Sequence, residues 1–399
     1  MATADRMPAE LHPRHLLVRT AEIAAIIAVV VLGISALPGL GEVRARLQGA
    51  DPTWVVAVVL AEVGSCGGYL LVFRATFCAQ MPWGLSYDIA MAELAANSLL
   101  PAGGAGGLAL GVWALRQAGM PTGHIGRRTV AFFVVTSAAN FFALILVGLA
   151  AFVGLLAGRH DVLLTLVPAL ITALGVLIVA LCPRLLRALS SRGGDGEGEG
   201  EGDGGADGGA DPGTDRRTDP GTDRRTDRRT DRRADGRAAD LRARAGQWLR
   251  QSLSAGADGV DQAIGLLRSH GFGVVVGSLA YMGFDIAALG FAFAAVGQVP
   301  VFSTLVLGYL IGQLGNLIPL PGGVGGTEGA LIAVFALYGV NLADATAAVL
   351  LYRLFQLLVP AFIGTPAFVM LRRRLLQADR PALVCAPLAV DTVHLPARD

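Results

Sequence analysis

Long apolar stretches separated by short polar segments make up most of the chain. As helices, these stretches are each about long enough to cross a hydrocarbon core of about 30 Å. The pattern predicts an all-α, polytopic membrane bundle with about six spanning helices. The first span follows a basic lead and could instead be a signal peptide, but no persuasive small-residue cleavage site follows, so we expect it to be retained. The predicted spans are Ile23–Leu40, Thr53–Phe73, Val130–Leu156, Val162–Leu181, Phe272–Val296 and Ala345–Met370.

Two further apolar segments are interrupted by proline and by a run of glycines. The first reads NSLLPAGGAGGLALG over residues 97–111, and the second reads NLIPLPGGVGGTEG over residues 316–329. The two motifs share one skeleton, in which Asn97 corresponds to Asn316. Their glycines correspond as well, with Gly103, Gly104, Gly106 and Gly107 matching Gly322, Gly323, Gly325 and Gly326.

Paired breaks of this kind are typical of transport sites between two inverted halves. Proline ends the first half-helix and glycine permits a tight turn, so each motif is predicted to form the tip of a re-entrant hairpin. The free N–H groups that begin the second half-helix would suit an anion such as a phosphate. The alternative is that the glycines only let helices pack closely. Because two runs occur in register, we favour the transport site.

The chain changes character between Ser190 and Asp240. Gly, Asp and Glu dominate there and give way to Thr-Asp-Arg-Arg repeats, a composition that predicts a disordered linker. The segment that follows has apolar residues at helical spacing opposite several arginines, which predicts an amphipathic helix on the membrane surface. The predicted organisation is a membrane half (1–190), a linker (191–240), a surface helix (241–270), a second membrane half (271–371) and a tail (372–399).

Composition supports a membrane protein without enzymatic chemistry. Hydrophobic residues make up 53% of the chain and charged residues 16%. With a mean hydropathy of +0.57, the chain is too apolar for an ordinary soluble protein. The four cysteines lack metal-type spacing, and we expect them to be free thiols. No lysine follows either glycine run, which excludes a nucleotide-binding loop. We therefore expect no metal, no cofactor, no nucleic-acid partner and no catalytic residues.

Arginine placement predicts the orientation in a cytoplasmic (plasma) membrane. Arginines gather in the lead, in the Arg116–Arg128 loop, beside the linker and after Met370. By the positive-inside rule, the amino terminus, the linker and the carboxyl tail are cytoplasmic. The Trp83–Leu115 segment then enters and leaves on the cytoplasmic side, and the Phe302–Tyr338 segment on the outer side.

Ionisable side chains inside predicted membrane segments mark candidate sites, because a charge there needs a partner or a cavity. Arg353 is the predicted partner of Glu328 or of a lipid phosphate. For Glu62 and Asp285, a structural hydrogen bond between helices is an equally good interpretation. The ionisable set is Glu62, Glu93, Asp285, Glu328 and Arg353, and the amides able to bond headgroups or unwound carbonyls are Asn97, Asn316, Gln313 and Gln356.

The stretch PLPGGVGGTEGALIAVFALYGV, followed by AAVLLYRLFQLLVPAFIG, resembles the signature of the lysylphosphatidylglycerol synthase transmembrane-region family, also called flippase-like membrane proteins. Asn97 and Pro101 resemble the family's first motif, although the usual Arg after that Pro and a Gly-Glu pair are absent here. The resemblance implies movement of modified phospholipid between leaflets, and we expect the soluble aminoacyl-transfer domain to be missing. The residues at the family's spacing are Pro321, Gly322, Gly323, Gly325, Glu328, Gly339, Arg353, Pro360 and Gly364.

The sequence thus predicts a protein that moves aminoacylated, anionic or other polar-headgroup phospholipid across the cytoplasmic membrane. The alternative is a non-catalytic scaffold for a lipid-modifying or lipid-linked glycan enzyme, which would need an exposed apolar face. A membrane-embedded transferase is disfavoured, because no acid–base or metal cluster is visible. The predicted substrate-binding residues are Asn97, Pro101, Gly103, Gly104, Asn316, Pro321, Gly322, Gly323, Gly325, Glu328 and Arg353.

Overall fold

The computed structural model describes residues 41–99, 105–158, 161–178, 181, 262–268, 271–317 and 326–376. These residues are mainly helical and include no strand, which confirms the predicted all-α class. The chain divides into two compact units, Met1–Val176 with Gly259–Asp399, and Leu177–Asp258. Nearly all described residues belong to the first unit.

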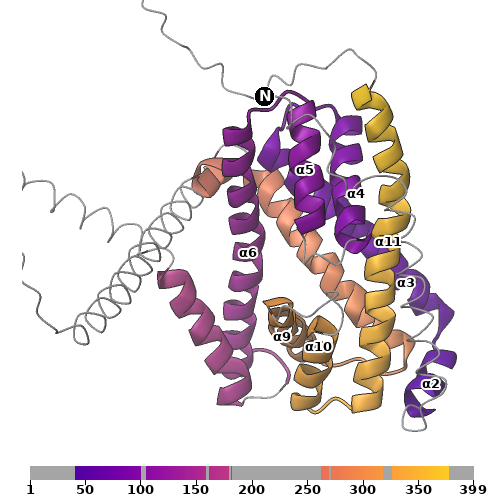
Figure 1. The fold of residues 1–399 in the computed structure, drawn as a ribbon. Helices are drawn as coiled ribbons and strands as arrows, with labels where there is room; N and C mark the ends of the chain where they lie inside the picture. The colour runs from indigo at the N-terminus through magenta and orange to yellow at the C-terminus, as the bar shows by residue number, and fades with distance from the viewer. Residues whose placement is uncertain are drawn as a thin grey trace, which may run out of the picture. The chain divides into compact units, whose positions relative to one another are not determined.

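The first half of this unit is a short helix, a long helix, a broken pair and a second long helix. Asp51 begins the first long helix, because its carboxylate accepts a hydrogen bond from Thr53 N at 2.8 Å. Pro52 occupies the first turn, where its missing N–H is not needed. The elements are α2 (Gly41–Gln48), α3 (Pro52–Phe77), the pair α4 (Trp83–Leu99) and α5 (Ala105–Gln117), and α6 (Thr122–Phe152) (Figure 1).

The second half repeats the order of a long helix, a broken pair and a long helix. It is preceded by an apolar helix, Val162–Ile178, whose first turn is the π-helical η3 (Val162–Leu166). The elements of the second half are the helix Gly271–Ala295, the pair formed by α9 (Phe302–Gly312) with η4 (Gln313–Leu317) and α10 (Gly326–Leu337), and α11 (Leu342–Leu376).

Four of the described helices are long and apolar enough to cross a membrane, namely α3, α6, Gly271–Ala295 and α11. They correspond to four of the predicted spans, and the protein is a multi-pass membrane protein. The predicted span Val162–Leu181 corresponds to the shorter helix Val162–Ile178, and Ile23–Leu40 lies outside the described residues. The total of six spans therefore stays a prediction.

The two broken pairs lie toward opposite ends of α11 (Figure 1). The α4 helix packs on the carboxyl-terminal part of α11, where Gly364 lies against Met91 and Ala95. At the same end, Arg374 forms an ion pair with Asp88 (3.0 Å). The inverted relation of the two halves and the re-entrant path of each pair remain predictions.

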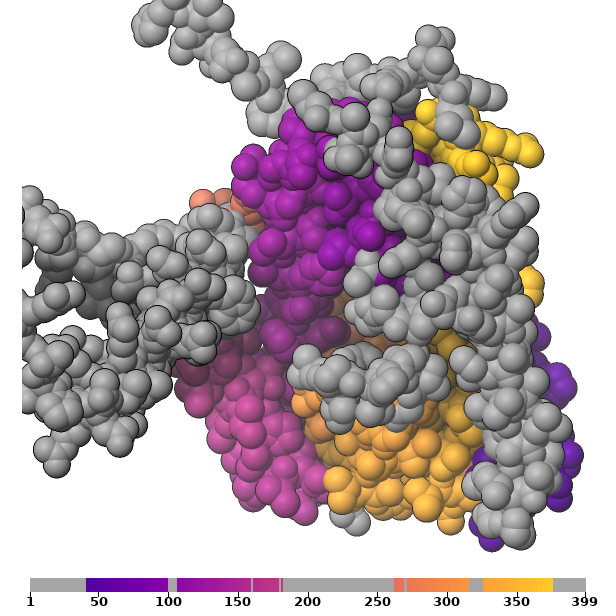
Figure 2. Space-filling model, viewed as in Figure 1, coloured from indigo at the N-terminus to yellow at the C-terminus, as the bar shows by residue number. Residues whose placement is uncertain are grey.

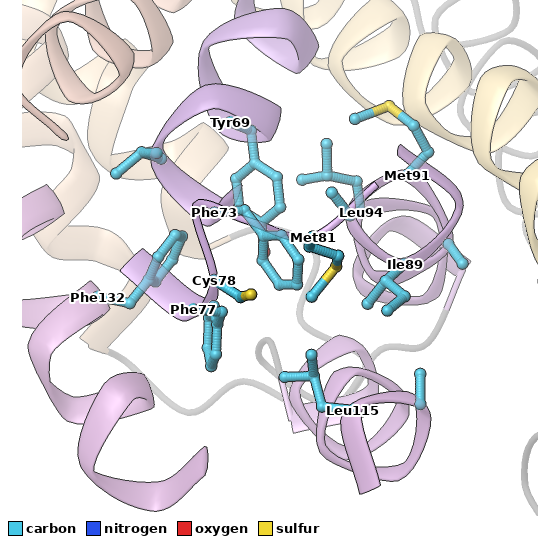
Figure 3. Close-up of a cluster of buried hydrophobic side chains, with 14 of the residues drawn as sticks. Tyr69, Phe73, Phe77, Cys78, Met81, Ile89, Met91, Leu94, Leu115 and Phe132 are labelled. Atoms are coloured by element: carbon cyan, nitrogen blue, oxygen red, sulfur yellow. The ribbon is translucent and has the colours of Figure 1, made fainter. Parts of the chain in front are cut away.

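Two apolar clusters fill the unit, one toward each end of the long helices. The first gathers aromatic side chains of α3, Met81 of the turn after α3, and residues of α4, α5 and α6, including Tyr69, Phe73, Leu115 and Phe132 (Figure 3). The second includes Phe293, Phe335 and Tyr352.

The long helices pass from one apolar cluster to the other near their middles. On α3 the change falls between Ala61 and Cys66, and on the Gly271–Ala295 helix it falls between Tyr281 and Met282. These positions mark the middle level of the unit.

The second broken pair and the Val162–Ile178 helix are neighbours in space. Tyr338, which follows α10, donates a hydrogen bond to the carbonyl of Leu164 (2.6 Å). On the face shown in Figure 2, the magenta helix lies beside the orange segments of the second half. The second broken pair is therefore held by the Val162–Ile178 helix as well as by α11.

Several predicted segments lie outside the described residues. These are the lead, the linker 191–240, the surface helix 241–270 except its residues 262–268, and the tail beyond residue 376. The expectation of free thiols holds for Cys66, which is buried, and is wrong for Cys78, which is disulfide-bonded.

Candidate functional site

Arg353 of α11 and Glu328 of α10 form a largely buried ion pair. Arg353 Nε lies 2.8 Å from Glu328 Oε1, and the two side chains are 17% and 13% exposed. Glu328 stands in the first turn of α10, where a carboxylate is favoured by the helix dipole. The predicted proximity of these two residues is confirmed.

The guanidinium of Arg353 also reaches a second partner. Its Nη1 donates to the side-chain oxygen of Gln356, one turn further along α11. The amide nitrogen of Gln356 in turn donates to both carboxylate oxygens of Asp285, at 3.2 and 3.3 Å. Gln356 therefore connects the ion pair to a buried carboxylate on the Gly271–Ala295 helix.

Asp285 is held by hydroxyl groups from two other helices. The hydroxyl of Tyr309 on α9 donates to Oδ2, and the hydroxyl of Tyr352 on α11 donates to Oδ1 at 3.0 Å. Because the Asp285 side chain is buried, these donors offset the cost of removing its polar atoms from water. We call Asp285, Tyr309, Glu328, Tyr352, Arg353 and Gln356 the central polar network.

Glu62 of α3 lies next to this network and, within the described part of the chain, has fewer hydrogen-bond partners than Asp285. Its side chain is 2% exposed, and Oε1 has no hydrogen-bond partner among the described residues. The carboxyl group interacts electrostatically with Asp285 and Arg353. A buried polar atom without a partner is uncommon and calls for a functional explanation.

A close helix crossing brings Glu62 to this place. Ser65 Oγ donates to the carbonyl of Tyr281 (3.2 Å), which lies one turn before Asp285. A side chain added at Gly68 would press on the backbone of Ala280 and Tyr281, so the two helices approach here without intervening side chains. Glu62 and Asp285 lie close to the level where the two apolar clusters meet.

Asn97, in the first motif, forms a bond between the two helices of its own pair. Its Oδ1 accepts a hydrogen bond from Gly107 N at 2.9 Å, so it satisfies one of the free N–H groups in the first turn of α5. A Cβ on Gly107 would collide with Asn97, and one on Gly111 would lie 3.0 Å from the Glu93 carboxyl carbon. Close packing thus explains these two glycines, as the alternative interpretation expects.

The second broken pair uses glycines in the same way but from its first helix. A Cβ on Gly308 would meet the ring of Phe335, and one on Gly312 would meet Leu331. Gly315 lies against the backbone of Gly326 in the first turn of α10. In both pairs, small residues let two short helices pack closely on either side of the break.

Replacing Asn97 with alanine is expected to destabilise the protein by about 1 kcal/mol, because Gly107 N–H loses its acceptor in a partly buried place. Asn97→Asp keeps the acceptor and should cost less. Ser98→Ala is the matched control, because Ser98 Oγ only bonds Leu94 O of its own helix. Chemical denaturation of purified protein in detergent measures all three, and equal stability of Asn97→Ala and Ser98→Ala would contradict the inferred role.

Among the remaining predicted site residues, only Asn316 lies within the described residues. Asn316 lies in η4, which continues the first helix of the second pair. The others fall in the two breaks, which lie outside the described residues, and they are Pro101, Gly103, Gly104, Pro321, Gly322, Gly323 and Gly325.

The tyrosines of the central polar network were not anticipated from the sequence. Tyr309 and Tyr352 provide the donors that make a buried Asp285 tolerable. A tyrosine hydroxyl in an otherwise apolar helix needs a hydrogen-bond partner. The chain has only six tyrosines, so these two could have been singled out as donors to a buried carboxylate.

The site combines one guanidinium with three carboxyl groups, from Glu62, Asp285 and Glu328. Among the described residues, no group of three or more His, Cys, Asp or Glu is placed to hold a metal ion. The planar guanidinium matches the geometry of a phosphate, which it can bind through two parallel hydrogen bonds. Within the central polar network, Arg353 therefore supplies the cation that an anionic headgroup would need.

Comparison with known proteins agrees with the resemblance found in the motifs. Residues 223–364 match the family described as the lysylphosphatidylglycerol synthase TM region, which confirms the predicted resemblance over the second half. This range contains the whole central polar network, whereas the first motif lies outside it. No solved structure matches the chain.

One curated relative is a UPF0104 membrane protein from Methanothermobacter thermautotrophicus. It is 34% identical over 113 residues, which are 28% of this chain. The chain spans about a third (32%) of the length of that relative. The chain is thus a multi-pass membrane protein related to these two groups of membrane proteins.

Proposed function

We propose that this chain, a membrane protein related to the lysylphosphatidylglycerol synthase TM region, moves phospholipid between the leaflets of the membrane. The headgroup would be anionic, aminoacylated or otherwise polar, and its phosphate would bind at Arg353. Our proposal includes cytoplasmic placement of the amino terminus, the linker and the carboxyl tail, as the arginine pattern predicts.

The observation that carries the proposal is the placement of Arg353. Its guanidinium lies between Glu328, at the start of the second helix of the broken pair, and Gln356, which bonds Asp285. An arginine inside a membrane bundle is costly and is by default a candidate functional residue. The Arg353 side chain is 17% exposed, so a phosphate could reach it and displace Glu328 as its partner.

The broken pairs support the same function. Short helices that end inside a bundle are tolerated only where their free backbone groups meet protein or a wet cavity. In the first pair, Asn97 satisfies one of these groups at Gly107. The two pairs lie toward opposite ends of α11, as expected if a headgroup passes between them (Figure 1).

The test is leaflet-resolved movement of labelled phospholipids in proteoliposomes. We would compare an anionic lipid, a zwitterionic lipid and a lysyl-modified lipid, using wild type, Arg353→Lys and the exposed control Arg116→Ala. We expect movement of at least one class by wild type and Arg116→Ala, and its loss in Arg353→Lys. A folded wild type that moves none of the three would overturn the proposal and favour the scaffold alternative.

A further inference from the structure

We propose that Glu62, facing Asp285 across the crossing of α3 and the Gly271–Ala295 helix, is a proton-binding site coupled to the lipid movement. The inference rests on the proposed function, because it names the ion that would drive it. Its ligand is a single proton, carried on the carboxyl group of Glu62.

Glu62 is buried, and one of its two carboxyl oxygens, Oε1, has no hydrogen-bond partner among the described residues. By contrast, Asp285 accepts from Tyr309, Tyr352 and Gln356. A carboxylate at Glu62 would be buried without a donor to that oxygen, whereas a neutral carboxylic acid there is far less costly.

Among the described residues, carboxyl groups outnumber cations in and beside the central polar network. Glu62, Asp285 and Glu328 are three carboxyl groups beside one guanidinium, and Arg353 is already paired with Glu328. Two neighbouring carboxyl groups in a low-dielectric interior do not both ionise readily. Asp285 has the donors, so the proton belongs on Glu62.

Titratable and charged groups from three helices surround Glu62. Within the part of the chain that the structure describes, Arg353 is the one cation that acts on Glu62. The groups are Asp285 and Tyr281 on the crossing helix, Tyr352 and Arg353 on α11, and Cys66 on α3 itself, with Tyr309 and Glu328 reached through the network.

A row of buried acids and tyrosines extends from this place toward the first broken pair. Tyr281 packs edge to face with Tyr69 (ring centroids 5.5 Å apart), and the Tyr69 hydroxyl interacts with the Glu93 carboxyl of α4. Glu93 Oε2 is another buried oxygen without a hydrogen-bond partner among the described residues. Protonatable groups therefore connect the first broken pair to the central polar network.

Electrostatic attraction and repulsion couple proton binding at Glu62 to phosphate binding at Arg353. A phosphate at Arg353 adds negative charge beside Glu62 and favours its protonation, and by reciprocity a proton on Glu62 favours phosphate binding. Only the O–H bond of Glu62 forms and breaks, with water on either side as the proton's source and destination. A proton and an anionic lipid would therefore travel in the same direction.

The first experiment detects the proton without any lipid movement. Infrared spectra of the purified protein near neutral pH should show the C=O stretch of a protonated carboxyl group. This band should be lost in Glu62→Gln and kept in Glu42→Gln, an exposed control on α2, while Glu93→Gln separates the contribution of Glu93. A band that survives Glu62→Gln unchanged overturns the inference.

The second experiment imposes a pH gradient on proteoliposomes that carry a labelled anionic phospholipid. Wild type should enrich the lipid in the leaflet facing the more alkaline compartment, and Glu62→Gln should lose this enrichment although it still folds. Drift to the acidic side, or a response to a sodium gradient alone, overturns proton coupling. If the infrared band behaves as expected but no lipid moves under any gradient, the proton site stands and the proposed function fails.

Discussion

Replacing Arg353 with alanine is expected to destabilise the protein by about 3 kcal/mol, toward the lower end of the cost of breaking a buried ion pair. Glu328 would lose the Nε–H donor at 2.8 Å, and Gln356 would lose the donor that orients its amide. The lower end applies because the two side chains keep 17% and 13% exposure to solvent. Chemical denaturation in detergent measures the change.

The double variant Glu328→Ala/Arg353→Ala separates the loss of the interaction from the cost of leaving Glu328 buried without its cation. Removing both charges leaves neither uncompensated, so we expect the double variant to be more stable than Arg353→Ala alone. Arg116→Ala, an exposed change at the end of α5, should match wild type. If Arg353→Ala and Arg116→Ala unfold at the same denaturant concentration, the ion pair contributes nothing to the stability of the fold.

Arg353→Lys then tests function apart from stability. Lysine keeps the positive charge but cannot hold Glu328 and Gln356 through one planar fork, nor bind a phosphate with two parallel bonds. We expect most of the stability to remain while lipid movement falls to background. A fully active Glu328→Ala/Arg353→Ala variant would instead show that neither side chain is needed for transport.

The sequence alone was enough to predict the long helices and the proximity of Glu328 and Arg353. Apolar runs of membrane-spanning length can form only helices there, so α3, α6, the Gly271–Ala295 helix and α11 lie close to their predicted ranges. Glu328 and Arg353 could be paired from the sequence because each was a charge in apolar surroundings and needed a partner.

The rest of the site depends on how the helices cross, which the sequence did not show. Helix α3 is apolar on most of its surface, so its pattern does not tell which face meets another helix. The crossing that brings Glu62 to Asp285 is instead set by two glycines, Gly68 and Gly277. Without the crossing, the roles of Tyr309 and Tyr352 as donors to Asp285 could not be inferred.

Gly68→Ala is expected to be among the most damaging single changes in the chain, although it adds one methyl group. The new Cβ would lie 2.8 Å from the carbonyl carbon of Ala280 and from the Cα of Tyr281, and still closer to the Tyr281 nitrogen. These are backbone atoms, so no side-chain rotation relieves the overlap and the helices must separate. We expect a loss of about 3 kcal/mol or more, at or above the usual range for overpacking.

The neighbouring Gly67→Ala is the matched control, because it makes the same chemical change on the same helix. An added Cβ at Gly67 would meet nothing within 4 Å. Alanine is favoured over glycine in helices by about 1 kcal/mol. We therefore expect Gly67→Ala to equal or exceed wild type in thermal stability, while Gly68→Ala falls well below it. If both variants had the stability of wild type, α3 and the Gly271–Ala295 helix would not cross at Gly68, and Glu62 would not be held against Asp285.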